Sequence, residues 1–255
     1  MGMGKIIAVV NQKGGVGKTT TCVNLSAALV ENGAHVLLCD MDPQSNATSG
    51  MGVDKNLETP SIYNVLIDGI EAVDAVISTP YGDVLPSNRI LAGAGVELVM
   101  MQGREFVLKN VLEQLRDDYD YIFIDCPPSL EMLTLNSLCA ADTVLIPVQC
   151  EYFALEGLSD LMSTIRMIKN ALNPNLEIEG VLLTMYDSRT NFSSQVAAEI
   201  KKFFKQKTYT ISIPRNVRLA EAPSHHEPAT KYDRSSRGSV AYIELAKEFL
   251  KRNYS

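Results

Sequence analysis

The stretch that decides the fold lies near the start of the chain, where residues 11–21 read NQKGGVGKTTT. It follows a short apolar run rich in β-branched residues (5–11) and leads into an expected helix that starts at Lys18. A glycine-rich turn between a strand and a helix is typical of phosphate-binding loops, because backbone N–H groups converge on an anion there. The standard pattern G-x-x-x-x-G-K-[ST] nevertheless fails, since Gln12 stands where the first glycine belongs and Lys13 is an additional lysine.

The residue types of this loop predict how it would hold the phosphates of a nucleotide. Gly14, Gly15 and Gly17 lack a Cβ, so backbone N–H groups can approach an anion closely. Lys18 would reach the β- and γ-phosphates, and the Thr19 hydroxyl would ligate Mg²⁺. We therefore expect the nucleotide to contact a continuous run of residues: Lys13, Gly14, Gly15, Val16, Gly17, Lys18, Thr19 and Thr20.

Acidic residues at the ends of two further apolar runs complete the predicted site. Asp125 ends the run YIFID (121–125), a Walker B pattern, and is expected to hold Mg²⁺ through water. Asp40 and Asp42 follow another apolar run, and we expect Asp40 to support the magnesium shell and Asp42 to orient the attacking water. Because an aspartate is a weak base, slow hydrolysis would follow.

Apolar runs and helix-like segments alternate along the whole chain, which indicates an α/β fold: a mostly parallel sheet covered by helices on both faces, formed by one domain over 1–255. The expected strands are 5–11, 35–40, 83–86, 97–101, 121–125, 143–148, 178–184 and 210–214. The expected helices are 18–32, 61–66, 104–117, 130–140, 154–170, 192–205 and 239–252.

Composition narrows the class of protein. Apolar residues make up 46% of the chain and charged residues 21%, as in soluble globular proteins. No apolar run reaches the ~18 residues that span a bilayer, and the first residues lack the order of a signal peptide, so we expect a cytoplasmic location. The five cysteines form no C-x-x-C pair, which favours reduced, buried thiols over disulfides or an iron–sulfur cluster.

Basic residues are concentrated in one segment of a chain whose net charge is −7. Residues 189–218 contain seven basic side chains and a single acid, so this segment is compatible with binding to the DNA backbone. On the expected helix 192–205, we predict that three lysines face water, opposite a buried apolar stripe of Phe192, Val196, Ile200, Phe203 and Phe204. The predicted DNA contacts are Arg189, Lys201, Lys202, Lys205, Arg215 and Arg218.

The motifs KGGVGKTT, DMDPQSNAT, YIFIDCPPS, IPVQCEYFALEGL and IPRNVRLAEAPSH together resemble the ParA/Soj chromosome-partitioning ATPases, within the wider ParA/MinD group of P-loop proteins with a deviant Walker A motif. The resemblance covers essentially the whole chain. In that group the loop reads K-G-G-x-G-K-[ST], so Gln12 is no defect. It implies that Lys13 is the signature lysine, which crosses an ATP-bound sandwich dimer to the partner's phosphates.

The same resemblance implies further roles and partners. Lys13, Lys18 and Asp42 would be catalytic in ATP hydrolysis, with Mg²⁺ as cofactor, and the adenine would lie near residues Met185, Pro214 and Asn216. The ATP-bound homodimer would bind double-stranded DNA without sequence preference, on the bacterial nucleoid. A ParB-like centromere-binding protein would trigger hydrolysis and release, in chromosome or plasmid segregation. No helix-turn-helix precedes the ATPase core, which argues against reading of a specific operator.

Two other classes of function stay open at this point. A MinD-like membrane ATPase needs a C-terminal amphipathic anchor with a basic face, but the polar face of 239–252 mixes acids and bases, and we expect no membrane partner. A metabolic synthetase or a relative of the nitrogenase iron protein would need a substrate pocket or a cluster, and no second constellation of residues indicates one. His225 and His226 lie in a polar loop and are expected to be exposed.

Overall fold

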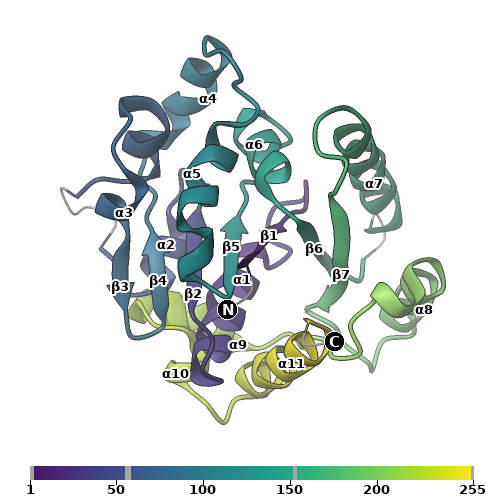
Figure 1. Cartoon of the computed structure of the whole chain (residues 1–255). Coiled ribbons are helices and arrows are strands. Elements are labelled where there is room, and N and C mark those ends of the chain that lie inside the picture. The colour runs from purple at the N-terminus through teal and green to yellow at the C-terminus, as the bar shows by residue number, and fades with distance from the viewer. Residues whose placement is uncertain (1–2, 55–58, 152–153, 254–255) are drawn as a thin grey trace.

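The computed structural model describes residues 3–54, 59–151 and 154–253. Within these residues one seven-stranded sheet runs in the order β3-β4-β2-β5-β1-β6-β7 (Figure 1). Every neighbouring pair is parallel except β3 and β4, which form an antiparallel edge. The strands are β1 Lys5–Val9, β2 Val36–Asp40, β3 Ile77–Thr79, β4 Gly82–Leu85, β5 Tyr121–Asp125, β6 Thr143–Gln149 and β7 Glu177–Thr184.

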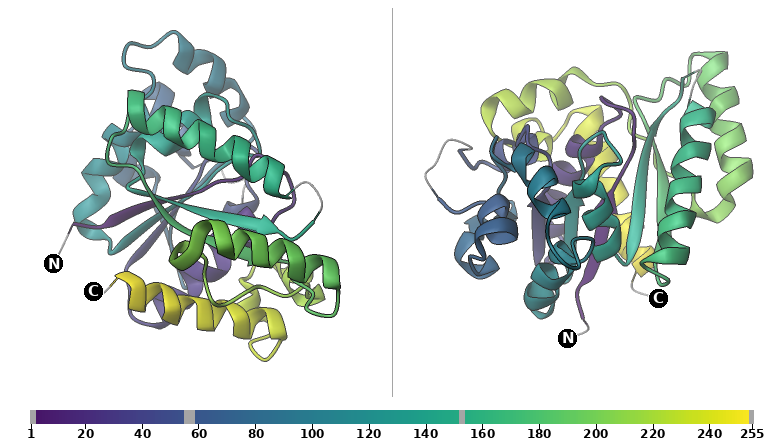
Figure 2. Two further views of the ribbon diagram at one scale, coloured as in Figure 1. Left: turned by 90° about the vertical axis from the view of Figure 1, so that its right-hand side faces the viewer. Right: turned by 90° about the horizontal axis from the view of Figure 1, so that it is seen from above.

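Helices cover both faces of the sheet, as the sequence predicted (Figures 1 and 2). The strand β1 illustrates why: Ile6 and Ala8 face one apolar core, whereas Ile7 and Val9 face the other. Helices α4 to α8 pack on the first face, and α1, α2 and α11 on the second. The helices are α1 Lys18–Glu31, α2 Asn46–Gly50, α3 Ala72–Ala75, α4 Leu91–Val99, α5 Val107–Leu115, α6 Met132–Ala140, α7 Ala154–Ala171, α8 Asn191–Phe204, α9 Val217–Glu221, α10 Ala229–Tyr232 and α11 Arg237–Asn253, with short π- or 3₁₀-turns η1 Asn64–Asp68, η2 Arg116–Asp118, η3 Lys205–Lys207 and η4 Ala222–His225.

Two of the predicted strands are wrong. Residues 97–99 belong to helix α4, and residues 210–214 run beside β7 without forming a strand. The N–H groups of Tyr209, just before the second segment, and of Ile213 within it donate to β7. Those of Thr210 and Ile211 donate instead to the carboxylate of Glu248 on α11. A side-chain acceptor from another helix therefore interrupts the backbone ladder.

The predicted apolar stripe of α8 is buried only in part. Val196 and Ile200 are buried, but Phe192 and Phe203 are 44% and 66% exposed. The helix sits at the margin of the molecule, so only one narrow side of it meets the core (Figure 2). The prediction of a fully buried stripe was wrong for these two phenylalanines.

Two expectations from composition are confirmed. All five cysteines are free and buried. His225 and His226 are exposed. In the described part of the chain no helix combines the length and apolarity that a membrane crossing requires.

Candidate active site

The predicted loop and its acidic partners meet at one edge of the sheet. The loop follows β1, Asp125 ends β5 and Asp40 ends β2, and the strand registers pair Val9 with Asp125 and Asp125 with Asp40. The carboxyl edge of a parallel sheet is where such folds bind their ligands. Residues that are more than 80 positions apart in the sequence are thus brought together by strand order alone.

The loop conformation depends on two glycines. Gly15 and Gly17 have φ angles of 72° and 91°, a region that residues with a Cβ seldom adopt. A Cβ built on Gly14 or Gly15 would meet no atom within 4 Å, so open space lies in front of these backbone groups. This arrangement fits the phosphate groups that the sequence predicted here.

Two residues that sequence reasoning missed hold the loop in place. The Asn11 side chain makes two hydrogen bonds: its Oδ1 accepts from the Lys13 N–H (3.0 Å), and its Nδ2 donates to the backbone carbonyl of Pro147 on β6 (2.7 Å). The Thr184 hydroxyl, at the end of β7, donates to the Val16 carbonyl (2.7 Å). Neither contact has a local signature, because each joins the loop to a strand more than 130 residues away.

The two lysines of the loop differ in their surroundings. Lys18 is buried, and its ammonium lies 3.3 Å from the carbonyl oxygen of Lys13, to which it donates a hydrogen bond. Burial lowers the pKa of Lys18, and the nearby carboxylate of Asp125 opposes that shift. Lys13 is exposed on the rim, where its ammonium pairs with the carboxylate of Glu151, just after β6. No sequence pattern predicted this ion pair.

The oxygen atoms predicted to hold Mg²⁺ lie together. The Thr19 hydroxyl donates to a carboxylate oxygen of Asp125 over 2.7 Å. Burial, and then the neighbouring Asp40, raises the pKa of Asp125, so the site disfavours an uncompensated negative charge. Thr19 and Asp125 offer oxygen ligands, and Mg²⁺ would take its other ligands from phosphate and water. The described residues contain no cluster of three or more His, Cys, Asp or Glu side chains that could hold a metal.

Asp40 is fully buried and connects the end of β2 to helix α2. One of its carboxylate oxygens accepts from the Asp42 N–H (3.1 Å), and the other accepts from the N–H and hydroxyl of Thr48 (2.8 and 2.7 Å). The hydroxyl of Ser87 donates to the Asp42 carbonyl (2.8 Å), and the Ser87 N–H donates to the Thr48 hydroxyl (2.9 Å). These contacts favour Asp40 as the residue that positions Asp42. Its part in the magnesium shell stays a prediction.

Two of the residues predicted near the adenine, Met185 and Pro214, lie at the end of β7, whose Thr184 contacts the loop. Met185 directly follows Thr184 and has a left-handed φ of 49°. Residues 186 and 214 form an isolated bridge, which brings Pro214 to the end of β7. Asn216 caps helix α9 by accepting a hydrogen bond from the Arg218 N–H (2.9 Å). Contact of these residues with a base stays a prediction.

The predicted DNA contacts fall into two groups on the side of the molecule that carries α8 and α11 (Figure 2). Arg189 and Arg215 line one depression of about 740 Å³, together with Arg237, which sequence reasoning missed because it lies outside the basic segment. The three lysines of the α8 region are exposed as expected. Arg218 is paired with two acids and Arg189 with Asp187, which reduces the positive field of both arginines. Asp187 and Glu244 also line the depression, so its three arginines are partly compensated.

The comparisons with known proteins agree with this geometry. A family model described as an AAA domain matches residues 4–178. The chain is 56% identical over 248 residues to the sporulation initiation inhibitor protein Soj of Bacillus subtilis, covering 96% of this chain and 98% of that protein. It is 50% identical to the chromosome partitioning protein ParA of Myxococcus xanthus over 253 residues, covering 98% and 89%. Among solved structures, cobyrinic acid a,c-diamide synthase from Mycobacterium smegmatis, with bound ADP and magnesium, has a TM-score of 0.86 and 39% identity over 99% of this chain and 96% of that one.

Proposed function

The chain belongs to the ParA and Soj family of chromosome-partitioning ATPases, and we propose that it is an ATP-driven switch that binds DNA as a dimer and leaves it on hydrolysis. The observation that carries the proposal is the contrast between its two loop lysines. Lys18 is buried beside Asp125, where it can serve the chain's own phosphates. Lys13 lies exposed on the rim, paired with Glu151, where it could exchange that carboxylate for the phosphates of a second chain.

Hydrolysis at this site would rest on four side chains. Lys18 neutralises the phosphate charge that develops as the terminal phosphate leaves. Thr19 and Asp125 would hold Mg²⁺, which would supply further positive charge next to the phosphates. Asp42 orients water toward the phosphate. Hydrogen bonds to Asp40 and Ser87 hold the backbone of Asp42 in place, which suits a side chain that orients the attacking water.

Dimerisation follows if Lys13 reaches phosphate only on the partner. ATP then contributes to the interface itself, so ATP binding and association become linked equilibria. In this proposal the monomeric chain keeps Lys13 against Glu151, and the dimer exchanges that carboxylate for phosphate.

The DNA surface would combine the depression lined by Arg189, Arg215 and Arg237 with the lysines of α8. These side chains are exposed and positively charged, which suits the phosphate backbone and gives no means of reading base sequence. A dimer doubles the number of phosphate contacts, which makes DNA binding depend on ATP. A ParB-like centromere-binding protein would stimulate hydrolysis and so release the dimer from the nucleoid.

DNA affinity of the wild type, Arg189→Ala, Arg237→Ala and the control Arg89→Ala, each with ATP, ADP or no nucleotide, tests the proposal. Arg89 is also exposed but follows β4, in the other half of the sheet. We expect ATP-dependent binding that falls steeply with salt, and a loss of affinity in the first two variants alone. Affinity that ignores nucleotide or salt would contradict the proposal.

A synthetase is the second candidate, because a solved relative at 39% identity is a diamide synthase. ATP turnover that rises with a small carboxylic acid and ignores DNA would favour it. Four ParA and Soj relatives that are named for chromosome partitioning match at 46–50% identity and favour the partition function.

A further inference from the structure

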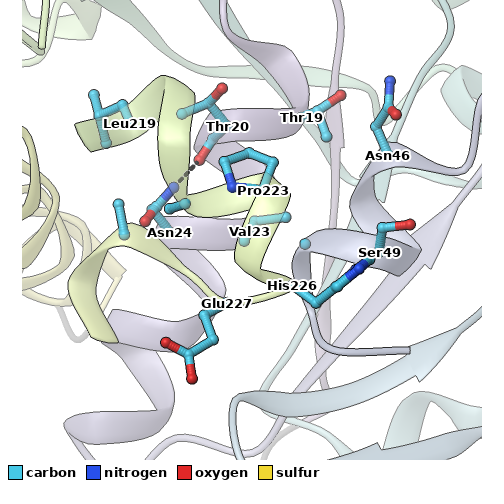
Figure 3. Close-up of a pocket in the computed structure, with 13 residues that line it drawn as sticks. Thr19, Thr20, Val23, Asn24, Asn46, Ser49, Leu219, Pro223, His226 and Glu227 are labelled. Atoms are coloured by element: carbon cyan, nitrogen blue, oxygen red, sulfur yellow. Dashed lines mark hydrogen bonds between the residues drawn. The ribbon is translucent and has the colours of Figure 1, made fainter. Parts of the chain in front are cut away.

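A depression of about 450 Å³ lies beside the start of α1 (Figure 3). Thr19 and Thr20 of the predicted nucleotide site belong to its lining, but its other lining residues have no role in the proposed ATPase mechanism. Buried Val23 and Ala222 contribute an apolar floor, and the exposed side chains of Asn46 and His226 stand at its rim. Such a mixture of an apolar floor and a few polar groups is the usual composition of a binding pocket.

Three segments that meet in this depression are the ones that position the nucleotide site (Figure 3). The first is the start of α1, where Thr19 lines the depression and its hydroxyl bonds Asp125. The second is α2, which approaches α1 so closely that a Cβ on Gly50 would lie 3.0 Å from Val23. The third is α9 with the turn η4, which follows Asn216. An occupant would therefore touch all three at once.

A second depression of about 490 Å³ continues from the first. The two share His226 and Glu227, and the second extends over Gly52 to Pro80 and Tyr81. His226 adopts a left-handed φ of 56°, and its carbonyl would lie 3.4 Å from a Cβ on Gly52, so this junction is tightly packed. Together the depressions form a two-part groove, which suits an extended peptide better than a compact small molecule.

The charge of this groove indicates what kind of segment it takes. Neither depression has a lysine or arginine among its described lining residues, whereas Glu227 and Asp54 contribute carboxylates. The Glu227 carboxylate has no hydrogen bond or ion pair with any residue that the structure describes. The groove would repel DNA phosphates and attract a cationic side chain.

We propose that this groove, defined by the two depressions on either side of His226 and Glu227, docks an extended segment of the ParB-like partner, with an apolar side chain over Val23 and a basic side chain on Glu227. The inference rests on the proposed function and names the surface through which the partner acts. Because the groove has no lysine or arginine among its described lining residues, whereas three arginines and two acids line the other depression, partner and DNA would occupy different surfaces.

The hydrogen bonds of α2 connect the groove to Asp42, the residue proposed to orient the attacking water. Thr48 on α2 binds Asp40, and Asp40 in turn accepts the N–H of Asp42. A segment inserted between α1, α2 and η4 would shift α2 and with it Asp42. Docking would thereby change the rate of hydrolysis without contacting the phosphates.

The test compares Glu227→Lys with the control Glu71→Lys, which makes the same charge change at an exposed acid of the β3 side. The affinity of the purified ParB-like protein for each variant, loaded with a slowly hydrolysed ATP analogue, is measured together with its stimulation of ATPase activity. We expect Glu227→Lys to lose at least about tenfold in partner affinity and most of the stimulation, because a like charge replaces the attractive one. Its basal ATPase activity and DNA affinity should equal those of the wild type. Asn46→Trp, which fills the first depression from an exposed rim position, should weaken the partner in the same way.

The outcomes separate this inference from the proposed function. If the partner binds and stimulates the wild type and Glu227→Lys equally, the docking site is refuted while the partition function stands. If the partner neither binds nor stimulates the wild type, the proposed function itself fails. Equal weakening by Glu71→Lys would show a general charge effect and would also refute the groove.

Discussion

Replacement of Glu151 by glutamine should strengthen ATP-dependent dimerisation. In the chain as described, the Glu151 carboxylate holds the ammonium of Lys13, which must leave it to reach the partner's phosphates. Glutamine keeps the size and the hydrogen-bonding oxygen but removes the charge, so Lys13 is released at lower cost. The dissociation constant of the dimer should fall accordingly.

The expected magnitude follows from the exposure of the pair. The side chains of Lys13 and Glu151 are 46% and 38% exposed, so the pair is a surface ion pair. Such pairs contribute about 0.2–1 kcal/mol. Two pairs break when two chains associate, which gives about 0.4–2 kcal/mol, or about a two- to 30-fold change in the dissociation constant.

Sedimentation equilibrium with a slowly hydrolysed ATP analogue measures this change, at low and high salt. The control is Glu177→Gln, since Glu177 forms a comparable surface pair with Lys169 and should leave dimerisation unchanged. Salt should shrink the difference between Glu151→Gln and the wild type, because it screens exposed charges. Weaker dimerisation in Glu151→Gln would refute the reasoning, since it would make Glu151 a contact of the dimer rather than a competitor for Lys13.

Three further outcomes are expected. Asp42→Ala should accumulate as an ATP-bound dimer on DNA, and a monomer in ATP by sedimentation would contradict the role of Asp42 in hydrolysis. Thr184→Val leaves the Val16 carbonyl without its donor, so calorimetry should show a loss of about 1–3 kcal/mol and a melting temperature lower by about 2–4 °C per kcal/mol, with a raised KM for ATP. Burial would raise the pKa of Glu179, but the ammonium of Lys5, 2.5 Å from its carboxylate, outweighs burial, and the pKa is lowered. A carboxylate whose pKa is lowered in the folded protein stabilises it at pH values above the unfolded pKa of about 4.3, and this contribution is lost as the pH falls through the folded pKa. Without the Lys5 ammonium, Lys5→Met should no longer be destabilised in this way as the pH falls. The free energy of unfolding in urea should therefore differ less between pH 7 and pH 4 in this variant than in the wild type.

The phosphate loop could be predicted because its chemistry is local. Gly15, Gly17 and Lys18 lie within four residues, and their types alone specify positive φ angles and a cation at the start of a helix. The ends of the apolar runs likewise placed Asp125 and Asp40 correctly, since parallel strands bring their carboxyl ends to one edge. The pattern of apolar runs was therefore sufficient to predict the fold class and the edge of the sheet at which the site lies.

The contacts that shape the site could not be predicted, because they join distant segments. Nothing near Asn11 or Thr184 in the sequence indicates that one reaches β6 and the other reaches the loop. The failed strand at 210–214 has the same cause, since Glu248 on α11 takes the N–H groups that a ladder would use. The exposed Phe203 reflects the marginal position of α8, which its own periodicity does not encode.

The two buried carboxylates at the site explain why its architecture suits a switch. Asp40 and Asp125 face each other at the ends of paired strands, and the burial of two like charges is unfavourable. Asp40 is compensated from within, by Thr48 and the backbone of Asp42. Among the residues that the structure describes, the Asp125 carboxylate has only the Thr19 hydroxyl and the thiol of Cys22 as hydrogen-bond donors. The deficit of positive charge therefore falls on Asp125, the group aimed at the predicted cation. A cation that binds with the nucleotide would compensate the Asp125 carboxylate and so weaken its repulsion of Asp40. Because Asp40 is hydrogen-bonded to Thr48 on α2 and to the backbone of Asp42, binding at Asp125 would change the forces on both.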